Sequence, residues 1–263
     1  MRSTARKKRT LLPIVLRWDA NNPLPTQVIR ATAKRSTPIF TGQPWADSGC
    51  ANQPFDFSAA IRELLADIQV RCPDFQHIQV PRILLSVTQA RGGHPHGLQA
   101  RITPMRFPRG ALTRIRHNVT YHIQRYFLDE CEFLYVMTFC LPRFLDQSFE
   151  QKFITLFHEL YHIHPAFNGD LRRHEGRYAF HSHSQRAYNQ HMTHYAREYL
   201  ACKPDPRLSD FLRMDFTQLQ SRHGAVTGIV VPRPKIIPLV GSYASAANIT
   251  PTPPNNDTEE GQP

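Results

Sequence analysis

Two histidines and a glutamate stand at the spacing H-E-x-x-H in the segment QSFEQKFITLFHELYHIHP, as His158, Glu159 and His162. On a helix, residues four apart lie on one face, so the two imidazoles can bind one zinc ion. The glutamate beside them is placed to accept a proton from a zinc-activated water. The pattern therefore predicts a Zn²⁺ site with His158 and His162 as ligands and Glu159 as the general base.

A catalytic zinc site needs a third protein ligand and an open fourth position. Eight of the 14 histidines lie between residues 158 and 194, so several candidates exist. The metzincin continuation requires Gly at 165 and His at 168, where this chain has Pro165 and Asn168, and that class is excluded. The remaining candidates follow the H-E-x-x-H segment: His174, His181 and His183, with Glu175 and Glu198 as carboxylate alternatives.

The segment that follows H-E-x-x-H is also expected to supply a donor that stabilises the oxyanion formed during peptide hydrolysis. The candidates by position are Tyr178, His181 and Arg177, because the loop that carries them must fold toward the metal. In such a site a peptide substrate adds itself as a strand to the edge of a sheet. We expect that edge in the strand at 132–141 or in the hairpin at 82–107.

Helical periodicity predicts the element that positions the motif. Ser148 followed by Gln151 is a capping-box signature, and apolar residues repeat at helical spacing from Phe149 to Ile163 until Pro165 ends the pattern. Further helices are predicted over 58–71, over 184–201 and, shorter, over 208–222.

Strand-forming runs precede the motif helix. The runs at 82–90 and 97–107 are separated by RGGHPH, which predicts a β-hairpin. The run at 132–144 is nearly continuously apolar, as in a strand buried on both faces. We therefore expect an α+β fold in which a small mixed β-sheet packs against the helix that carries H-E-x-x-H and against further helices.

The two ends of the chain differ from this middle part in composition. Six prolines within residues 13–54 disfavour regular helix, so residues 1–54 are expected to form a flexible, basic, proline-rich arm. The polar, proline-rich end predicts an extended and disordered tail over 226–263. The globular domain is thus expected to span 55–225.

The chain is basic, with a formal net charge of +11, and five of its cations lie in the first nine residues. Such an excess favours weak association with nucleic acid or another polyanion, through the basic surface and the N-terminal arm. No apolar run approaches the roughly 20 residues of a membrane span, and no signal-peptide core is visible. Five cysteines form no close pair and indicate reduced thiols. We expect no membrane partner and a cytoplasmic location.

The segments HELYHIHPAFNGD and HSHSQRAY resemble motifs of the phage-type and bacterial zinc metallopeptidases of the zincin kind, and the resemblance covers roughly residues 55–200. It implies a zincin-like fold and the hydrolysis of a protein or peptide substrate. The implied ligands are His158, His162 and His183, with His181 and His174 as alternatives for the third, and Glu159 is the implied general base. Ser184 stands after His183, where the family pattern has Asp.

Two other functions are consistent with the sequence. A catalytically weak protein that binds a metal or a partner would not require Glu159. A DNA-associated protease similar to the SprT-like group would use the positive charge as an anchor, although the chain has no CxxC pair for the zinc ribbon that often accompanies that group.

Overall fold

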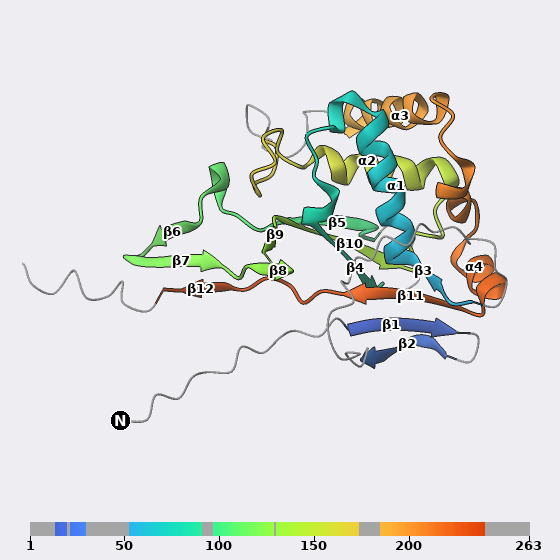
Figure 1. Cartoon of the computed structure of the whole chain (residues 1–263), viewed down its shortest axis with the longest axis horizontal. Coiled ribbons are helices and arrows are strands. Elements are labelled where there is room, and N and C mark those ends of the chain that lie inside the picture. The colour runs from blue at the N-terminus through green and yellow to red at the C-terminus, as the bar shows by residue number, and fades with distance from the viewer. Residues whose placement is uncertain are drawn as a thin grey trace, which may run out of the picture.

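A computed structural model describes residues 14–19, 22–29, 53–90, 97–128, 130–173 and 185–239, which form a mixed α+β fold (Figure 1). The α-helices are α1 (Phe57–Arg71), α2 (Phe149–Tyr161), α3 (Gln185–Ala201) and α4 (Phe216–His223). The short 3₁₀ helices are η1 (Pro73–Phe75), η2 (Val80–Arg82), η3 (Pro108–Gly110), η4 (Pro206–Leu208) and η5 (Asp210–Arg213).

The strands fall into small sheets. The first six are β1 (Ile14–Asp19), β2 (Asn22–Ile29), β3 (Phe55–Asp56), β4 (Ile83–Gln89), β5 (Ala100–Pro104) and β6 (Thr113–Arg116). The others are β7 (Val119–Ile123), β8 (Tyr126–Leu128), β9 (Cys131–Phe133), β10 (Tyr135–Leu141), β11 (Ala225–Val230) and β12 (Ile236–Pro238).

The central sheet has the strand order β4-β10-β5, with β10 parallel to β4 and antiparallel to β5. Six of the seven residues of β10 are buried, which confirms the strand predicted there to be covered on both faces. The predicted hairpin of 82–90 with 97–107 is wrong, because β10 inserts between the two strands. For the same reason β10 cannot supply a free edge, and β5 lies at the edge instead.

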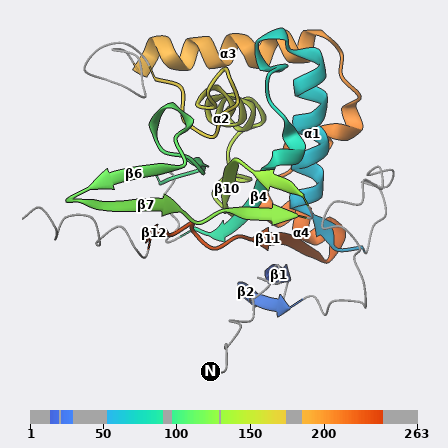
Figure 2. The same ribbon diagram turned by 60° about the vertical axis from the view of Figure 1, so that its left-hand side comes forward.

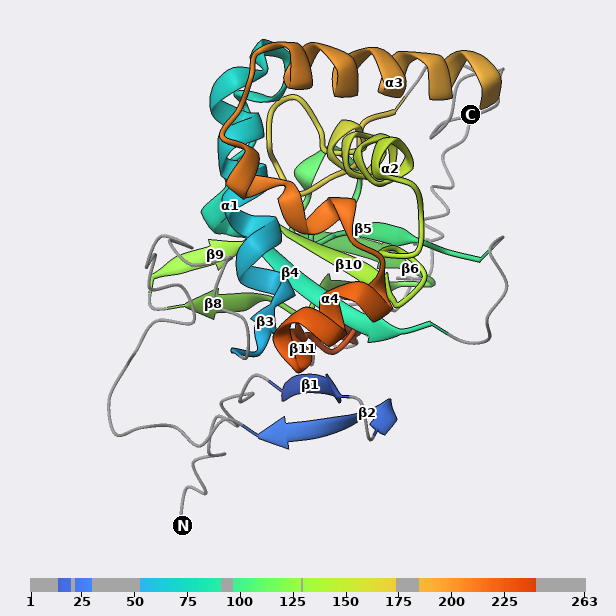
Figure 3. The same cartoon turned by 90° about the vertical axis from the view of Figure 1, so that its right-hand side faces the viewer.

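Helices cover one face of this sheet, and α3 lies along the outer side of α2 (Figures 1 and 3). Phe57 of α1 contacts Phe139 of β10, with ring centroids 5.3 Å apart. Phe157 of α2 packs against Tyr195 and Tyr199 of α3 at 6.0 and 6.3 Å. The helix with the H-E-x-x-H motif is thus held between the sheet and α3.

The predicted helices at 58–71, 149–163 and 184–201 are confirmed as α1, α2 and α3. The helix predicted over 208–222 is instead divided into η5 and α4. Asp215 causes the break, because its side chain accepts a hydrogen bond from the backbone N–H of Gln218 and starts a new helix with a capping box.

A second sheet has the order β2-β1-β11-β3, and β1 pairs antiparallel with β11. The expected flexible arm over 1–54 therefore does not hold for residues 14–19 and 22–29. The expected disordered tail from 226 does not hold for residues 226–230 of β11 or for residues 236–238 of β12, which pairs with β7. Trp18 explains the difference: it is 1% exposed, and its Nε1–H donates to Gln89 Oε1 at 2.7 Å. The rest of the predicted arm before residue 53 and the tail beyond 239 lie outside the described residues.

Strands β6, β7 and β12 form a ribbon with the order β12-β7-β6, which projects from the body of the protein (Figure 2). Cys72, Cys131, Cys140 and Cys202 are free thiols. Among the described helices none has the length and hydropathy needed to cross a membrane.

One ionic cluster joins β9 to the loops beside it. Glu132 accepts hydrogen bonds from Arg125 and, at 2.6 Å, from Arg106. These bonds, with Arg125 contributing most, lower the pKa of Glu132 to about 2. Since its ordinary pKa is 4.5, the cluster stabilises the fold fully above pH 4.5 and loses this effect as the pH falls toward 2.

We expect Glu132→Gln to lower the free energy of unfolding at pH 7 by up to about 3 kcal/mol. Urea denaturation between pH 7 and pH 2.5 checks this, because the difference from wild type should shrink as the pH falls. Glu150→Gln is the control: this exposed carboxylate pairs with Arg197 at 3.3 Å, and its loss should cost below about 1 kcal/mol. A pH-independent difference for Glu132→Gln would contradict the prediction.

Candidate metal centre

The H-E-x-x-H motif lies at the C-terminal end of α2. Ser148 caps the other end, because its Oγ accepts a hydrogen bond from the backbone N–H of Gln151 at 3.3 Å, as the sequence predicted. His162 directly follows the last helical residue and keeps a helical backbone, with φ −68° and ψ −16°. The four-residue relation between His158 and His162 is therefore preserved.

The two imidazoles meet at their outer nitrogens. Nε2 of His158 and Nε2 of His162 are 3.1 Å apart, and the ring centroids are 4.7 Å apart. Two nitrogens that each lie 2.0–2.1 Å from a tetrahedral zinc ion are separated by about 3.3 Å. The pair thus fits two ligands of one ion, and imidazole nitrogen is a donor that zinc prefers.

Glu159 lies between these histidines in sequence and points toward the sheet. Its side chain is buried, and Oε2 accepts a hydrogen bond from the backbone N–H of Ile102 at 2.7 Å. Burial raises the pKa of Glu159 to about 7, although this hydrogen bond and the charge of Arg101 act in the opposite direction. A carboxyl group with a pKa near 7 can both accept and release a proton at neutral pH, as a general base must.

The hydrogen bond to Glu159 comes from the outer edge of β5. Gln99 and Met105 bond to β10, through Cys140 N–H to Gln99 O at 2.8 Å and Met105 N–H to Leu134 O at 3.0 Å. Because backbone groups alternate in direction along a strand, those of Ile102 point away from β10. Glu159 therefore sits directly against the free edge of the central sheet.

The loop after α2 is fixed to the sheet. Tyr135 of β10 donates its hydroxyl hydrogen to Asp170 O at 2.7 Å and accepts from the N–H of Gly169 at 3.1 Å. The buried carboxylate of Asp170 accepts from the backbone N–H groups of Arg109 and Leu171, at 2.7 and 2.8 Å. These bonds set the course of the chain as it leaves the two histidines.

The structure places His158, Glu159 and His162 at the C-terminal end of α2, with the two imidazoles in contact and Glu159 turned toward β5. The other candidates outside α3 lie beyond the described residues, namely His174, Glu175, Arg177, Tyr178, His181 and His183. Glu198 of α3 is exposed and pairs with His194 at 3.3 Å, which turns it toward solvent. Within the described ranges no three His, Cys, Asp or Glu side chains converge on one point, so the third ligand stays a prediction.

Two contributors to the site were missed from the sequence. Ile102 acts through its backbone N–H, which every residue except proline carries, so no residue type could reveal it. Tyr135 occurs in an apolar strand and looks like an ordinary core residue. The only available signal was its hydroxyl, which requires a partner when it is buried.

Comparisons of the chain with protein-family models, with curated proteins and with solved structures found no match. The candidate metal centre is therefore supported by the geometry of this chain alone.

Proposed function

We propose that this protein is a zinc-dependent metallopeptidase with a zincin-like arrangement of sheet and helix. The observation that carries the proposal is the pair of Nε2 atoms of His158 and His162, 3.1 Å apart, with the buried carboxyl group of Glu159 on the same turn of α2. A protein or peptide substrate and a cytoplasmic location belong to the proposal as predictions from the sequence.

His158 and His162 would hold Zn²⁺, with His183 as the first candidate for the third ligand and His181 and His174 as alternatives. When bound, the ion supplies a Lewis acid for the scissile carbonyl and lowers the pKa of a water ligand to about 7. Glu159 accepts the proton of the attacking water and transfers it to the leaving amine.

The outer edge of β5, which no described strand covers, supports the binding of an extended substrate. A peptide along this edge would bond chiefly to outward-facing carbonyls of β5, because the N–H of Ile102 already donates to Glu159 and Pro104 has none, and it would run directly past Glu159. Of the two edges predicted from the sequence, the strand at 132–141 is central in the sheet, and β5 lies within the other predicted segment, 82–107.

Metal content of the purified full chain, measured by plasma mass spectrometry, tests the proposal. Wild type should hold about one zinc per chain, and His158→Ala and His162→Ala should each lose most of it. His194→Ala is the matched control, since this exposed imidazole on α3 pairs with Glu198 and should leave the zinc in place. Wild type without zinc, or both motif variants with full zinc, would overturn the metal site.

The same measurement on His183→Ala, His181→Ala and His174→Ala identifies the third ligand. Loss of zinc in His183→Ala alone is the expected result. Loss in a different single variant would transfer the role of third ligand to that histidine and would leave His158 and His162 as the other two.

A further inference from the structure

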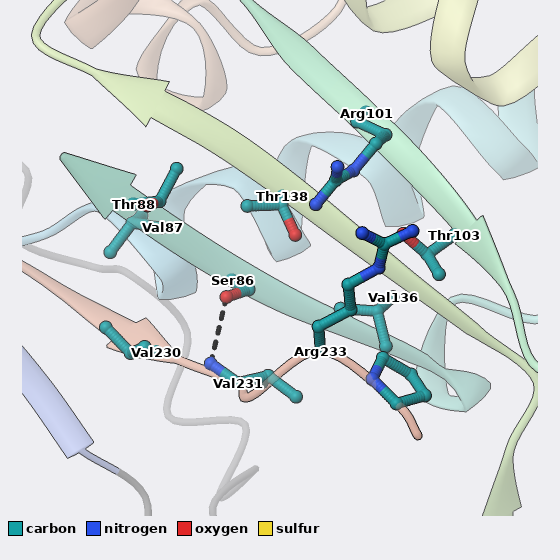
Figure 4. Close-up of a pocket in the computed structure, with 11 residues that line it drawn as sticks. Ser86, Val87, Thr88, Arg101, Thr103, Val136, Thr138, Val230, Val231 and Arg233 are labelled. Atoms are coloured by element: carbon teal, nitrogen blue, oxygen red, sulfur yellow. Dashed lines mark hydrogen bonds between the residues drawn. The ribbon is translucent and has the colours of Figure 1, made fainter. Parts of the chain in front are cut away.

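A second site lies on the opposite face of the central sheet. A pocket of about 190 Å³ opens there, lined by alternate residues of β5 and β10 that include Arg101, Thr103 and Thr138 (Figure 4). Side chains alternate between the two faces of a strand, so these residues point away from α2, toward which Ile102 points. The volume equals the share of about six water molecules in the liquid, which is room for a polyatomic anion.

Two guanidinium groups converge on this pocket. Arg101 reaches in from the sheet and Arg233 from the segment after β11, with the hydroxyls of Thr103 and Thr138 beside them (Figure 4). None of the described residues that line the pocket is acidic. Neither arginine forms a salt bridge with another described residue.

This arrangement matches an anion with several oxygens. The two guanidinium groups repel each other, because they carry like charges in one pocket. An anion bound between them is attracted to both, and these two attractions outweigh the repulsion. Guanidinium groups bind phosphate oxygens through two parallel hydrogen bonds, and threonine hydroxyls add further donors.

The wall that carries Arg233 is held in place by the fold. The backbone N–H of Val231 donates to Ser86 Oγ at 2.9 Å, a bond drawn in Figure 4. The hydroxyl of Tyr126 donates to Pro232 O at 2.9 Å. The N–H of Gln124 donates to Lys235 O at 2.7 Å. Arg233 is thus presented from a fixed backbone opposite Arg101.

The charge distribution in the sequence extends this cationic character beyond the pocket. Residues 75–128 contain eight arginines and neither Asp nor Glu. Residues 216–256, which contain Arg233, are also free of acidic residues. The first stretch supplies β4, β5, β6 and β7 and the second supplies β11 and β12, so the pocket and the ribbon are built from the two acid-free stretches together with β10.

The ribbon continues from the pocket. The segment that forms the pocket wall runs directly into β12, which pairs with β7 (Figures 1 and 2). On the neighbouring strand β6, Arg114 and Arg116 are exposed and lie on the same face, and Tyr121 of β7 is paired opposite Arg114. Cations next to an aromatic ring are the combination that contacts both the phosphates and the bases of a nucleic acid.

We propose that the pocket between Arg101 and Arg233 binds a phosphate group of a nucleic-acid strand, and that the neighbouring nucleotides follow Arg114, Arg116 and Tyr121 along the ribbon. A phosphodiester backbone repeats its negative charge along its length, and it therefore matches a surface that continues beyond one pocket. The inference does not depend on the metal site, which lies on the other face of the sheet.

Fluorescence anisotropy with a labelled 20-nucleotide single strand, and with the corresponding duplex, tests the proposal on the full chain. Arg101→Gln/Arg233→Gln should weaken binding about tenfold at 100 mM salt. It should also reduce the slope of log K against log salt by about 0.7 on the single strand, because one phosphate contact is lost. Arg114→Gln/Arg116→Gln should weaken binding as well.

The matched control is Lys203→Gln/Arg222→Gln. It also removes two positive charges, but from exposed positions: Lys203 follows α3 and Arg222 lies on α4. Because α4 leads into β11 and Arg233 follows that strand, Arg222 and Arg233 are separated by the length of β11. This variant should keep the affinity and the salt slope of wild type. Circular dichroism confirms that all variants are folded.

Equal affinity of the pocket variant and wild type would overturn the proposal, since the binding would then come from diffuse charge. An equal loss in the control variant would overturn it for the same reason. Binding of inorganic phosphate without any binding of either oligonucleotide would also overturn it, because the occupant would then be a small anion.

Discussion

Glu159→Gln is expected to lower kcat/KM for peptide hydrolysis by about 10²–10⁴-fold, the usual contribution of a general base, while the zinc content stays at the wild-type level. The amide can still accept the hydrogen bond of Ile102, so α2 and β5 keep their contact, but it cannot take up a proton. Hydrolysis of an unfolded protein substrate by zinc-loaded enzyme measures the effect. Glu198→Gln, which changes an exposed carboxylate on α3, is the control with wild-type activity.

The same variant should stabilise the metal-free protein at high pH. Burial raises the pKa of Glu159 from 4.5 to about 7, so the folded state binds its proton more tightly than the unfolded state. Stability from this group is therefore present below pH 4.5 and is lost as the pH rises through 7. After zinc removal, Glu159→Gln should exceed wild type by up to about 3 kcal/mol at pH 8 and by much less at pH 4.5.

Two results would count against this role of Glu159. Wild-type hydrolysis by the zinc-loaded glutamine variant would remove it as the general base and would favour a metal-binding protein without catalysis. A stability difference that does not change with pH would show that the carboxyl group is not held in a desolvated environment.

Lys152→Ala is expected to lower the free energy of unfolding by about 3–5 kcal/mol, the largest stability effect that we predict. Lys152 is 1% exposed on α2, and its Nζ donates to the carbonyls of Leu212 and Met214, each at 2.8 Å. Removal of the side chain leaves two carbonyls without this donor and opens a cavity between α2 and the η5 segment. Urea denaturation at pH 7 measures the loss.

Lys152→Met separates the two causes, because it keeps the volume and removes the donor and the charge. It should cost less than Lys152→Ala. Burial lowers the pKa of Lys152 to about 8, so wild type should gain stability between pH 8 and 10.5, where only the unfolded state keeps the proton, and the methionine variant should lack this gain. A loss below about 1 kcal/mol in Lys152→Ala would contradict the prediction.

Local patterns predicted the elements that carry the site. The capping signature at Ser148 and the apolar repeat of α2 depend on neighbours within one or two turns, and both the helix and its start are confirmed. The proximity of His158 and His162 follows from that helix alone. The side-by-side placement of the two imidazoles was therefore predictable without any tertiary information.

Strand pairing was not predictable in the same way. The runs at 82–90 and 97–107 are adjacent in sequence with a turn-forming connection, yet β10 from residues 135–141 lies between them. The apolar character of β10 predicted burial on both faces but did not specify its neighbours. The contact of Glu159 with Ile102 depends on this long-range order, so the environment that raises the pKa of Glu159 was invisible to sequence reasoning.

The same limit applies at the ends of the chain. The prolines of residues 1–54 argued against helix, and the strand IVLRWD was assigned to an arm although its partner β2 follows it directly; its second partner β11, about 200 residues away, could not be inferred from local pattern. The two arginines of the pocket proposed to bind phosphate were missed for a similar reason, since Arg101 and Arg233 meet only after the sheet has formed.

The pairing of β1 with β11 has a consequence for the order of assembly on the ribosome. Trp18 packs against Phe216, with ring centroids 5.9 Å apart, and bonds to Gln89, so its burial requires three distant parts of the chain. During synthesis β1 can pair with the neighbouring β2, but its other edge has no partner until β11 has been made, and that edge is exposed until then. Trp18 therefore reaches its buried position only after Phe216 and β11 have been synthesised, so this sheet is completed late in folding.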